Sequence, residues 1–299
     1  MGQATSVARV GLIGHPVAHS RSPALQQAAL DACGIAARYE LWDTPPEALA
    51  ARVAALRAPG VLGANVTVPH KLAVMPLLDA LAPSAARLAG SVNTIVVERG
   101  VGGMGGARLV GHSTDPAGLR AALGAARVAL AGRRVVLLGV GGAAHAAAGL
   151  VADEAALGLV IAARRSDAAA ALAADVRRRL PESATAIATA SLAGEALERA
   201  LAGCDLLINA TSAGMDGADQ VSALDLALLA LCPADAFVCD LIYAPAETPL
   251  LRAARVRGLR GMNGLPMLLH QGAAAFTLWT GKPAPLAAMR VALGLPPQG

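Results

Sequence analysis

The sequence predicts an α/β protein with two domains: an N-terminal one with a mainly parallel sheet and a Rossmann-type nucleotide-binding one. Short apolar runs alternate with helical stretches of ten or more residues, which is typical of βαβ units. The alternation starts again near residue 115, and a chain of 299 residues is long enough for two domains. A glycine-rich turn directly follows one of the later apolar runs.

The first part of the chain contains four runs that we expect to be strands. They are Val7–Ile13, Arg38–Trp42, Gly63–Thr67 and Val92–Val97. The glycine-rich stretch Val101–Val110 predicts a hairpin. Helices are expected over Pro23–Cys33, over Pro46–Leu56 and from Pro69 onward, because proline is favoured in the first turn of a helix and Gly34 is a stop signal.

The second part begins with a helix expected from about Asp115–Arg120. Four short apolar runs follow and predict strands that are buried on both faces of a sheet. They are Arg134–Leu138, Leu157–Ala162, Asp205–Asn209 and Ala236–Leu241. The stretches between them are rich in alanine and favour helices.

The composition excludes several classes of protein. The chain is 55% hydrophobic and only 15% charged, so it is not disordered. Two uncharged runs, Val135–Ala152 and Gly261–Gly281, reach the length of a membrane helix. Their glycines and polar residues favour burial inside a soluble fold instead. No N-terminal apolar run is long enough for a secretory signal. The four cysteines lack the spacing of a zinc site or disulfide framework, so we expect a cytoplasmic protein.

The charge pattern bears on partners. The net charge is +4, and the basic residues are scattered apart from Arg177–Arg179, which we expect to form a solvated helix face. A nucleic-acid-binding protein normally shows a basic stripe or a known module. We therefore expect no nucleic-acid or membrane partner, and a mildly basic protein suits a small anionic ligand. The histidines show no metal-ligand spacing, so no metal is expected.

A dinucleotide-binding loop is predicted at Gly139–Ala144, which reads G-x-G-x-x-A between a strand and a helix. Gly139 allows the tight turn, Gly141 lets the backbone approach a pyrophosphate, and the small Ala144 allows close packing of helix on strand. Gly142 and Ala143 complete the loop, whose helix N-terminus favours phosphate. The alternative is an ordinary tight βα turn.

The cofactor is predicted to be NADP(H) rather than NAD(H). About 20 residues after the loop, NAD-binding sites place an acidic residue for the ribose 2′-hydroxyl. Here the strand ends at Ala163, followed by Arg164 and Arg165, and guanidinium groups suit a 2′-phosphate. The alternatives are that both arginines are merely solvated, or that Asp167 weakens the preference.

Four polar segments in the first part of the chain stand at expected strand ends or helix starts. They are Gly14–Pro23, Gly63–Lys71, Gly90–Thr94 and Gly111–Asp115. Ligands bind at such positions in α/β sheets, and hydroxyls and amides there suit a polyhydroxylated molecule. For any one segment, the alternative is helix capping by Ser22 or Thr114.

Together with later motifs, these segments resemble the shikimate dehydrogenase family over about Val10–Gly281. The later motifs are the Gly139–Ala144 loop, Ile208–Met215, Asp240–Pro245, Glu247–Leu251 and Asn263–Gly272. The resemblance implies reversible, NADP-linked reduction of 3-dehydroshikimate to shikimate in aromatic amino-acid biosynthesis. It also implies an active site in the cleft between a substrate domain (1–114 plus 265–299) and a dinucleotide-binding domain (115–264).

The resemblance also implies roles for individual residues. Lys71 and Asp115 would be the catalytic pair, and Ser20 and Ser22 would bind the substrate carboxylate. Thr67 and Asn93 would hold ring hydroxyls, and Tyr243 and Gln271 would complete the substrate pocket. Gly264 and Met267 would contact the nicotinamide. Asn209, Thr211 and Ser212 would lie near the cofactor.

Chemistry supports the Lys71–Asp115 assignment independently. Reducing a carbonyl with hydride requires a proton donor at the developing alkoxide, and a carboxylate can orient a lysine ammonium for that task. The alternative is a structural salt bridge. Three residues depart from the family pattern: Ser113 replaces an asparagine, Ala163 and Arg165 flank the expected arginine where polar residues are usual, and Pro266 replaces a small residue.

Other functions remain open from the sequence alone. Ser22 favours shikimate, because quinate-using relatives tend to have threonine there. A quinate/shikimate or aminoshikimate dehydrogenase is still possible, as is a dehydrogenase of another carbonyl substrate. A non-catalytic NADP-binding sensor is the alternative from another class, although a sensor has no need of the Lys71–Asp115 pair. The resemblance permits a monomer or a homodimer.

Overall fold

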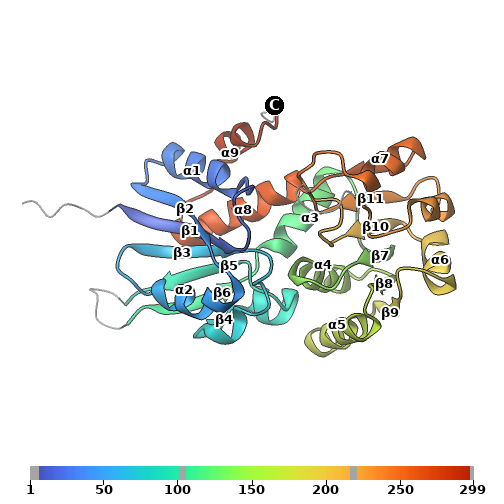
Figure 1. The fold of residues 1–299 in the computed structure, drawn as a ribbon, viewed down its shortest axis with the longest axis horizontal. Coiled ribbons are helices and arrows are strands. Elements are labelled where there is room, and N and C mark those ends of the chain that lie inside the picture. Colours follow the sequence, from blue (N-terminus) through green and yellow to red (C-terminus); the bar gives the residue numbers. More distant parts are fainter. Residues whose placement is uncertain (1–6, 101–105, 216–220, 297–299) are drawn as a thin grey trace, which may run out of the picture. The chain divides into compact units, whose positions relative to one another are not determined.

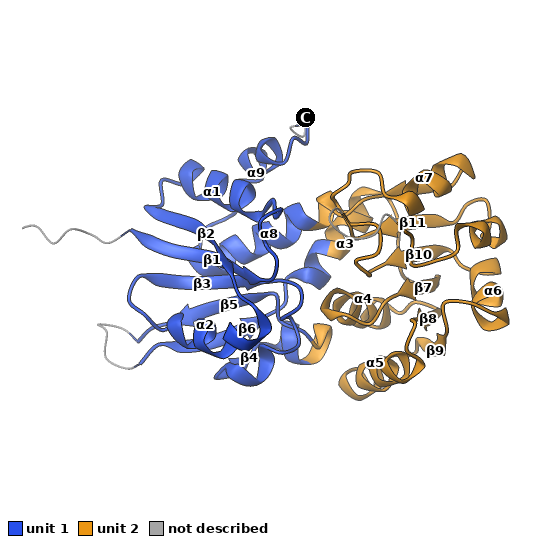
Figure 2. Cartoon of the chain, viewed as in Figure 1, with its two compact units in different colours: residues 1–86, 91–118, 268–299 blue, residues 87–90, 119–267 orange. Residues whose placement is uncertain are grey.

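The computed structural model describes residues 7–100, 106–215 and 221–296. The chain divides into two compact units (Figure 2). Unit 1 comprises Met1–Ala86, Ser91–Gly118 and Leu268–Gly299, and unit 2 comprises Arg87–Gly90 and Leu119–Met267. Helices α3 (Asp115–Ala125) and α8 (Leu265–Thr280) contribute residues to both units.

Unit 1 is built on a mixed sheet whose described strands have the order β2-β1-β3-β5-β6-β4 (Figure 1). The strands are β1 (Ala8–Gly14), β2 (Ala37–Asp43), β3 (Val61–Val66), β4 (Ala80–Leu81), β5 (Thr94–Glu98) and β6 (Arg108–His112). β1 pairs parallel with β2 and β3, and β4 pairs parallel with β6. β5 is antiparallel to both β3 and β6. Of the stretch Val101–Val110 that was expected to form a hairpin, residues 101–105 lie outside the described part, and residues 108–110 belong to β6.

Two of the three helices that prolines predicted in unit 1 are present: α1 (Ser22–Ala32), and η1 (Pro46–Ala48) followed by α2 (Leu49–Ala55). Besides α3 and α8, the other helical segments are η2 (Met75–Leu77), α9 (Leu286–Ala292) and the π-helical η3 (Ser84–Ala89), whose last three residues belong to unit 2. The helix expected from Pro69 is wrong: the chain forms successive turns there. The reason is tertiary, because the carbonyl of Lys71 accepts from the backbone N–H of Val92 at 2.9 Å instead of from its own helix.

Unit 2 has an all-parallel sheet whose described strands have the order β12-β11-β10-β7-β8-β9. The strands are β7 (Arg134–Leu138), β8 (Gly158–Ala162), β9 (Ala186–Ala190), β10 (Leu206–Asn209), β11 (Phe237–Asp240) and β12 (Arg260–Met262). The helical segments are α4 (Gly142–Asp153), α5 (Ser166–Arg179), α6 (Glu195–Ala202), η5 (Leu226–Leu231) and α7 (Pro249–Val256). The sequence did not predict β9 or β12, which are the sheet edges and show mostly exposed or half-buried residues.

Alternate residues of the central strands belong to two separate hydrophobic cores, one on each face of the sheet. Val135 and Leu137 of β7 pack with α4 and α5, whereas Val136 and Leu138 pack with α6 and α7. The prediction of strands buried on both faces is therefore confirmed. The long uncharged run Val135–Ala152 divides into β7 and α4, and the run Gly261–Gly281 divides into β12 and α8. No helix within the described ranges has the length and apolarity to span a membrane.

One arginine of the expected solvated face is instead buried. The side chain of Arg179 is only 7% exposed and donates from Nε to Asp175 Oδ2 at 2.7 Å. Its Nη1 donates to the backbone carbonyls of Arg87 at 2.9 Å and Leu88 at 2.6 Å. Gly149 permits this approach, because a Cβ there would lie 1.8 Å from the carbonyl oxygen of Leu88. Arg179 therefore ties residues 87–90 to α5.

The ion pair at Asp175 predicts a specific loss of stability in acid. Burial opposes its ionisation, but the side chains of His145 and Arg179 outweigh burial and hold the pKa of Asp175 well below its ordinary 3.8. A carboxyl with a lowered pKa stabilises the fold above its ordinary pKa, and this contribution is lost as the pH falls below that value. Arg179→Met should lower the free energy of unfolding at pH 7 by about 2 kcal/mol.

Urea denaturation of the wild type and the variant at several pH values between about 7 and 2.5 checks this. On acidification, the free energy of unfolding should fall less in the variant than in the wild type, because without Arg179 the pKa of Asp175 should lie closer to its ordinary value. Arg199→Met, which removes an exposed arginine of α6 that pairs with Glu195, is the matched control and should change little. An acid dependence as steep in Arg179→Met as in the wild type contradicts the prediction.

Candidate active site

Four polar residues that are distant in sequence meet in unit 1. Lys71 donates from Nζ to Asp115 Oδ2, and their side chains are 14% and 3% exposed. Asn93 donates from Nδ2 to Asp115 Oδ1 at 2.8 Å and to Gln271 Oε1 at 3.2 Å. The structure thus brings together both members of the predicted catalytic pair and two of the predicted substrate-binding residues.

Sheet topology explains why these residues meet. Lys71 follows β3, Asn93 precedes the antiparallel β5, and Asp115 follows β6, so all three lie at the same edge of the sheet. Backbone hydrogen bonds fix their segments: Val92 N–H donates to the Lys71 carbonyl at 2.9 Å, and Asn93 N–H donates to the His112 carbonyl at 3.1 Å. Ser20 and Thr67 follow the parallel strands β1 and β3 and therefore lie at this edge as well.

Ser22 is not the N-cap of the helix that it begins. Ser22 is the first residue of α1 and is buried, and its backbone N–H donates to Ser20 Oγ at 3.2 Å. Arg21 occupies the N-cap position. The capping alternative for Ser22 is therefore wrong, whereas Thr114 precedes α3 and directs its side chain to Asn93.

Sequence reasoning missed three residues that support the cluster. Thr114 donates from its backbone N–H to Asn93 Oδ1 at 2.8 Å. Thr94 donates from Oγ1 to the same oxygen at 3.0 Å, and Asn65 donates from Nδ2 to Thr94 Oγ1 at 3.2 Å. Each stands inside one of the polar segments described above, and burial of a polar strand residue is the signal that identifies it.

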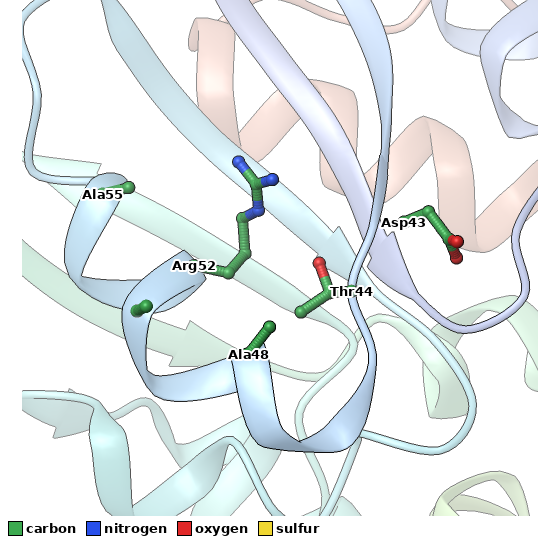
Figure 3. Close-up of a pocket in the computed structure, with 6 residues that line it drawn as sticks. Asp43, Thr44, Ala48, Arg52 and Ala55 are labelled. Atoms are coloured by element: carbon green, nitrogen blue, oxygen red, sulfur yellow. The ribbon is translucent and has the colours of Figure 1, made fainter.

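A surface hollow of about 290 Å³ lies beside α2 in unit 1 (Figure 3). It is lined by Asp43, Thr44, Ala48, Ala51, Arg52 and Ala55. None of the predicted site residues lines it. Arg52 is its cationic group, and that guanidinium lies 5.6 Å from the ring centroid of Trp42. The hollow offers no lysine–carboxylate pair of the kind found at Lys71.

The glycine-rich loop of unit 2 has the conformation that a dinucleotide site requires. Gly139 follows β7 with a φ of +108°, which favours glycine, and Gly141 is the N-cap of α4. A Cβ at Gly141 would meet nothing within 4 Å, which leaves the space through which a pyrophosphate could approach the backbone. Ala144 is fully buried against the sheet, as the predicted helix–strand contact requires. These residues fit a dinucleotide.

The buried carboxylate of Asp240 orients further residues of the predicted cofactor site. Asp240, at the end of β11, accepts from Asn209 Nδ2 at 2.9 Å, from Thr248 Oγ1 at 2.7 Å and from the backbone N–H of Ile242 at 3.1 Å. Burial raises the pKa of Asp240, although these hydrogen bonds oppose the shift. Asn209 in turn accepts from Thr211 Oγ1 at 2.7 Å, so Asp240 orients two predicted cofactor residues.

The remaining predicted residues lie in unit 2. Arg164 and Arg165 are exposed between β8 and α5, and Ser212 is exposed after β10. Tyr243 is half-buried after β11. Gly264 is buried so tightly that a Cβ would lie 2.1 Å from the Leu241 carbonyl oxygen, and Met267 is buried in the core of unit 2. In the described part of the chain, no cluster of three or more His, Cys, Asp or Glu side chains could hold a metal ion.

Two of the three departures from the family pattern, Pro266 and Ser113, fit their local structure. Pro266 is in the first turn of α8, where proline is favoured. Ser113 is buried, and its hydroxyl has no hydrogen-bond partner among the described residues, although its backbone N–H donates to Ser84 Oγ at 3.2 Å.

Ser113→Ala is therefore expected to be nearly silent. It removes a buried hydroxyl that is not hydrogen-bonded, so the free energy of unfolding should change by less than about 0.5 kcal/mol and kcat by less than about twofold. Thermal unfolding and steady-state kinetics measure both. Thr114→Val is the comparison, because it removes a bonded hydroxyl one residue later and should be clearly impaired. A large effect of Ser113→Ala shows that this hydroxyl has a function.

Comparisons with known proteins match this chain to one family. Residues 12–95 match the model of the shikimate dehydrogenase substrate binding domain, and residues 264–293 match that of the shikimate 5'-dehydrogenase C-terminal domain. The chain is 44% identical over 285 residues to shikimate dehydrogenase (NADP(+)) of Symbiobacterium thermophilum, covering 95% of this chain and 92% of that protein. This chain belongs to the shikimate dehydrogenase family.

Solved structures of the family have the same two-domain α/β fold. Shikimate 5-dehydrogenase of Thermus thermophilus, in complex with NADP(H) and shikimate, is 36% identical with a TM-score of 0.79, over 95% of this chain and 98% of that chain. Quinate dehydrogenase of Corynebacterium glutamicum, in complex with NAD, is 32% identical with a TM-score of 0.80, over 96% and 98%. Family members thus differ in both substrate and cofactor.

Proposed function

We propose that this chain is an NADP-dependent shikimate dehydrogenase that interconverts 3-dehydroshikimate and shikimate in aromatic amino-acid (chorismate) biosynthesis. The observation that carries the proposal is the pair formed by Lys71 and the buried Asp115, joined by Asn93 to Gln271. A curated relative that is 44% identical is named for this activity. In this proposal unit 1 binds the substrate and unit 2 binds the dinucleotide.

Lys71 would supply and receive the proton. When bound, NADPH supplies the hydride that adds to the carbonyl carbon. The carbonyl oxygen then takes a proton from the Lys71 ammonium, so the product is the neutral alcohol and the lysine is left neutral. Asp115 accepts from Lys71 and from Asn93, which holds the ammonium in place. In the oxidative direction Lys71 takes the hydroxyl proton.

The other residues would bind and orient the two small molecules. Ser20 and Ser22 bind the substrate carboxylate, and Thr67 and Asn93 bind ring hydroxyls. Gln271 and Tyr243 are the remaining substrate contacts. The loop Gly139–Ala144 holds the pyrophosphate. Asn209, Thr211 and Ser212 contact the cofactor, Gly264 and Met267 border the nicotinamide, and Arg164 and Arg165 bind the 2′-phosphate.

A cytoplasmic location belongs to the same proposal. The spacing of the four cysteines along the sequence is that of neither a disulfide framework nor a zinc site, which favours a reducing compartment.

The test is the absorbance of reduced nicotinamide with purified protein and shikimate, with NADP and NAD in separate assays and quinate as a parallel substrate. Rapid reduction of NADP with shikimate alone supports the proposal. Reduction of NAD, or turnover of quinate, assigns the chain to the dual-substrate relatives. A folded protein that binds NADP but gives no reaction in any of these assays overturns the assigned substrate.

A further inference from the structure

A buried chain of hydrogen bonds crosses unit 1 and ends at the proposed catalytic carboxylate. Tyr39 donates from Oη to Asn65 Oδ1 at 2.8 Å, and Asn65 donates from Nδ2 to Thr94 Oγ1 at 3.2 Å. Thr94 donates from Oγ1 to Asn93 Oδ1 at 3.0 Å, and Asn93 donates from Nδ2 to Asp115 Oδ1 at 2.8 Å. Each of the five side chains is at most 8% exposed.

We propose that Tyr39 and Thr94 are positioning residues for the reaction proposed above. Neither hydroxyl touches Lys71 or Asp115 directly in this chain of bonds. They act through the amides of Asn65 and Asn93. Their effect is to hold the Asp115 carboxylate, and therefore the ammonium that donates to it, in one orientation. The inference rests on the proposed function for its consequence in catalysis, but its structural claim can be tested without turnover.

The direction of every bond in the chain follows from its charged end. A carboxylate only accepts hydrogen bonds, so Asn93 must turn its NH2 group to Asp115 and its oxygen away. That oxygen requires donors, which are the Thr94 hydroxyl and the backbone N–H of Thr114. With its proton used, the Thr94 oxygen accepts from the NH2 of Asn65. The oxygen of Asn65 then faces Tyr39, whose hydroxyl must donate.

The placement of the chain keeps water from replacing any of these donors. Asn65 of β3 is directly opposite Thr94 of β5 in the antiparallel register. Trp279 of α8 packs over this face: its Nε1 donates to the Ile95 carbonyl at 3.0 Å, and its ring centroid is 6.3 Å from that of Tyr39. In such a site an amide that loses its partner is left unsatisfied, so removing one hydroxyl disturbs the next amide.

The consequences for catalysis are measurable. Thr94→Val removes one of the donors to Asn93 Oδ1 and the acceptor of Asn65 Nδ2, and it should lower kcat about tenfold, because small misplacements of catalytic groups are costly. Thr94→Ser keeps the hydroxyl and should stay within about twofold of the wild type. Tyr39→Phe removes the hydrogen bond to Asn65, which is the bond farthest from Asp115, and should lower kcat about threefold. The KM for NADP should not change, because the proposed cofactor residues belong to unit 2.

A second measurement does not require activity. The chain has two lysines, Lys71 and Lys282, so acetylation by acetic anhydride can be followed at Lys71 by mass spectrometry with the exposed Lys282 as internal standard. Thr94→Val and Tyr39→Phe should raise the ratio of Lys71 to Lys282 labelling, because a loosened carboxylate protects the ammonium less. Thr94→Ser should keep the wild-type ratio.

Thr280→Val is the matched control. It removes a hydroxyl of α8 that donates to the Phe276 carbonyl at 2.8 Å, outside the chain of bonds, and should lower only Tm. A folded Thr94→Val with wild-type kcat and labelling ratio overturns the inference, as does Thr94→Ser that is as impaired as Thr94→Val. If Thr94→Val does not fold, Tyr39→Phe decides by the same two readouts. A wild type that does not oxidise shikimate overturns the proposed function, whereas the labelling ratios still decide this inference.

Discussion

Lys71→Ala is expected to lower kcat for shikimate oxidation by about 10²–10⁴-fold, the range typical of losing a general acid–base group. Lys71 is half-buried and donates to the buried Asp115, so no other lysine can replace it. Without the ammonium, the alkoxide that forms during reduction has no proton donor. In the oxidative direction, the alcohol has no base. Steady-state kinetics in both directions measures the loss.

Substrate binding should weaken only modestly in this variant. The proposed carboxylate and hydroxyl contacts come from other residues, so the Kd of shikimate from calorimetry should change by much less than kcat. Lys282→Ala is the matched control, since it removes the other lysine, which is exposed and follows α8. A folded Lys71→Ala protein that retains most of its kcat eliminates the proton-transfer role and leaves the structural ion pair as the explanation.

Replacing Arg164 and Arg165 together by alanine is expected to raise the KM for NADP by about 10–100-fold. A charge-assisted hydrogen bond to phosphate contributes about 1.5–3 kcal/mol, and both guanidinium groups stand between β8 and α5 with no carboxylate at the strand end. NAD lacks the 2′-phosphate, so its KM should stay within about threefold of the wild-type value. Initial rates with each cofactor at saturating shikimate measure both.

Arg199→Ala serves as the control for the change in charge of unit 2. That arginine is exposed on α6 and pairs with Glu195. It should leave both KM values unchanged. An unchanged KM for NADP in the double variant shows that the arginines are solvated. An equal rise for NAD and NADP shows that they bind a part common to both cofactors.

Local patterns in the sequence predicted much of the fold because their physics is local. The loop at Gly139–Ala144 was recognisable because a strand, a positive-φ glycine and a helix start follow one another within a few residues. The strands of unit 2 were predicted because a strand buried on both faces must be apolar throughout. Edge strands such as β9 lack that constraint, and their half-exposed, alanine-rich residues resemble the surrounding helices.

Other predictions were wrong because hydrogen bonds between residues distant in sequence override the local pattern. The proline at position 69 favoured a helix, but the Val92 N–H takes the Lys71 carbonyl and turns the chain instead. Arg179 stands in an exposed-looking basic triplet, yet Asp175 and the carbonyls of residues 87 and 88 bury it. Asp175 is four positions from Arg179 and within its reach on the helix. No local pattern, however, indicates partners that are about 20 or 90 positions away.

By itself, the sequence determined the two-domain α/β class, the dinucleotide loop and the polar segments that contain the candidate site. These follow from hydrophobic periodicity and turn chemistry. Only the tertiary structure decided that Lys71, Asn93, Asp115 and Gln271 make contact, because β3, β5 and β6 must pair before their ends meet. It alone also decided which buried hydroxyls and amides orient that cluster. A buried polar group must find a partner, and the partner is chosen by the fold rather than by proximity along the chain.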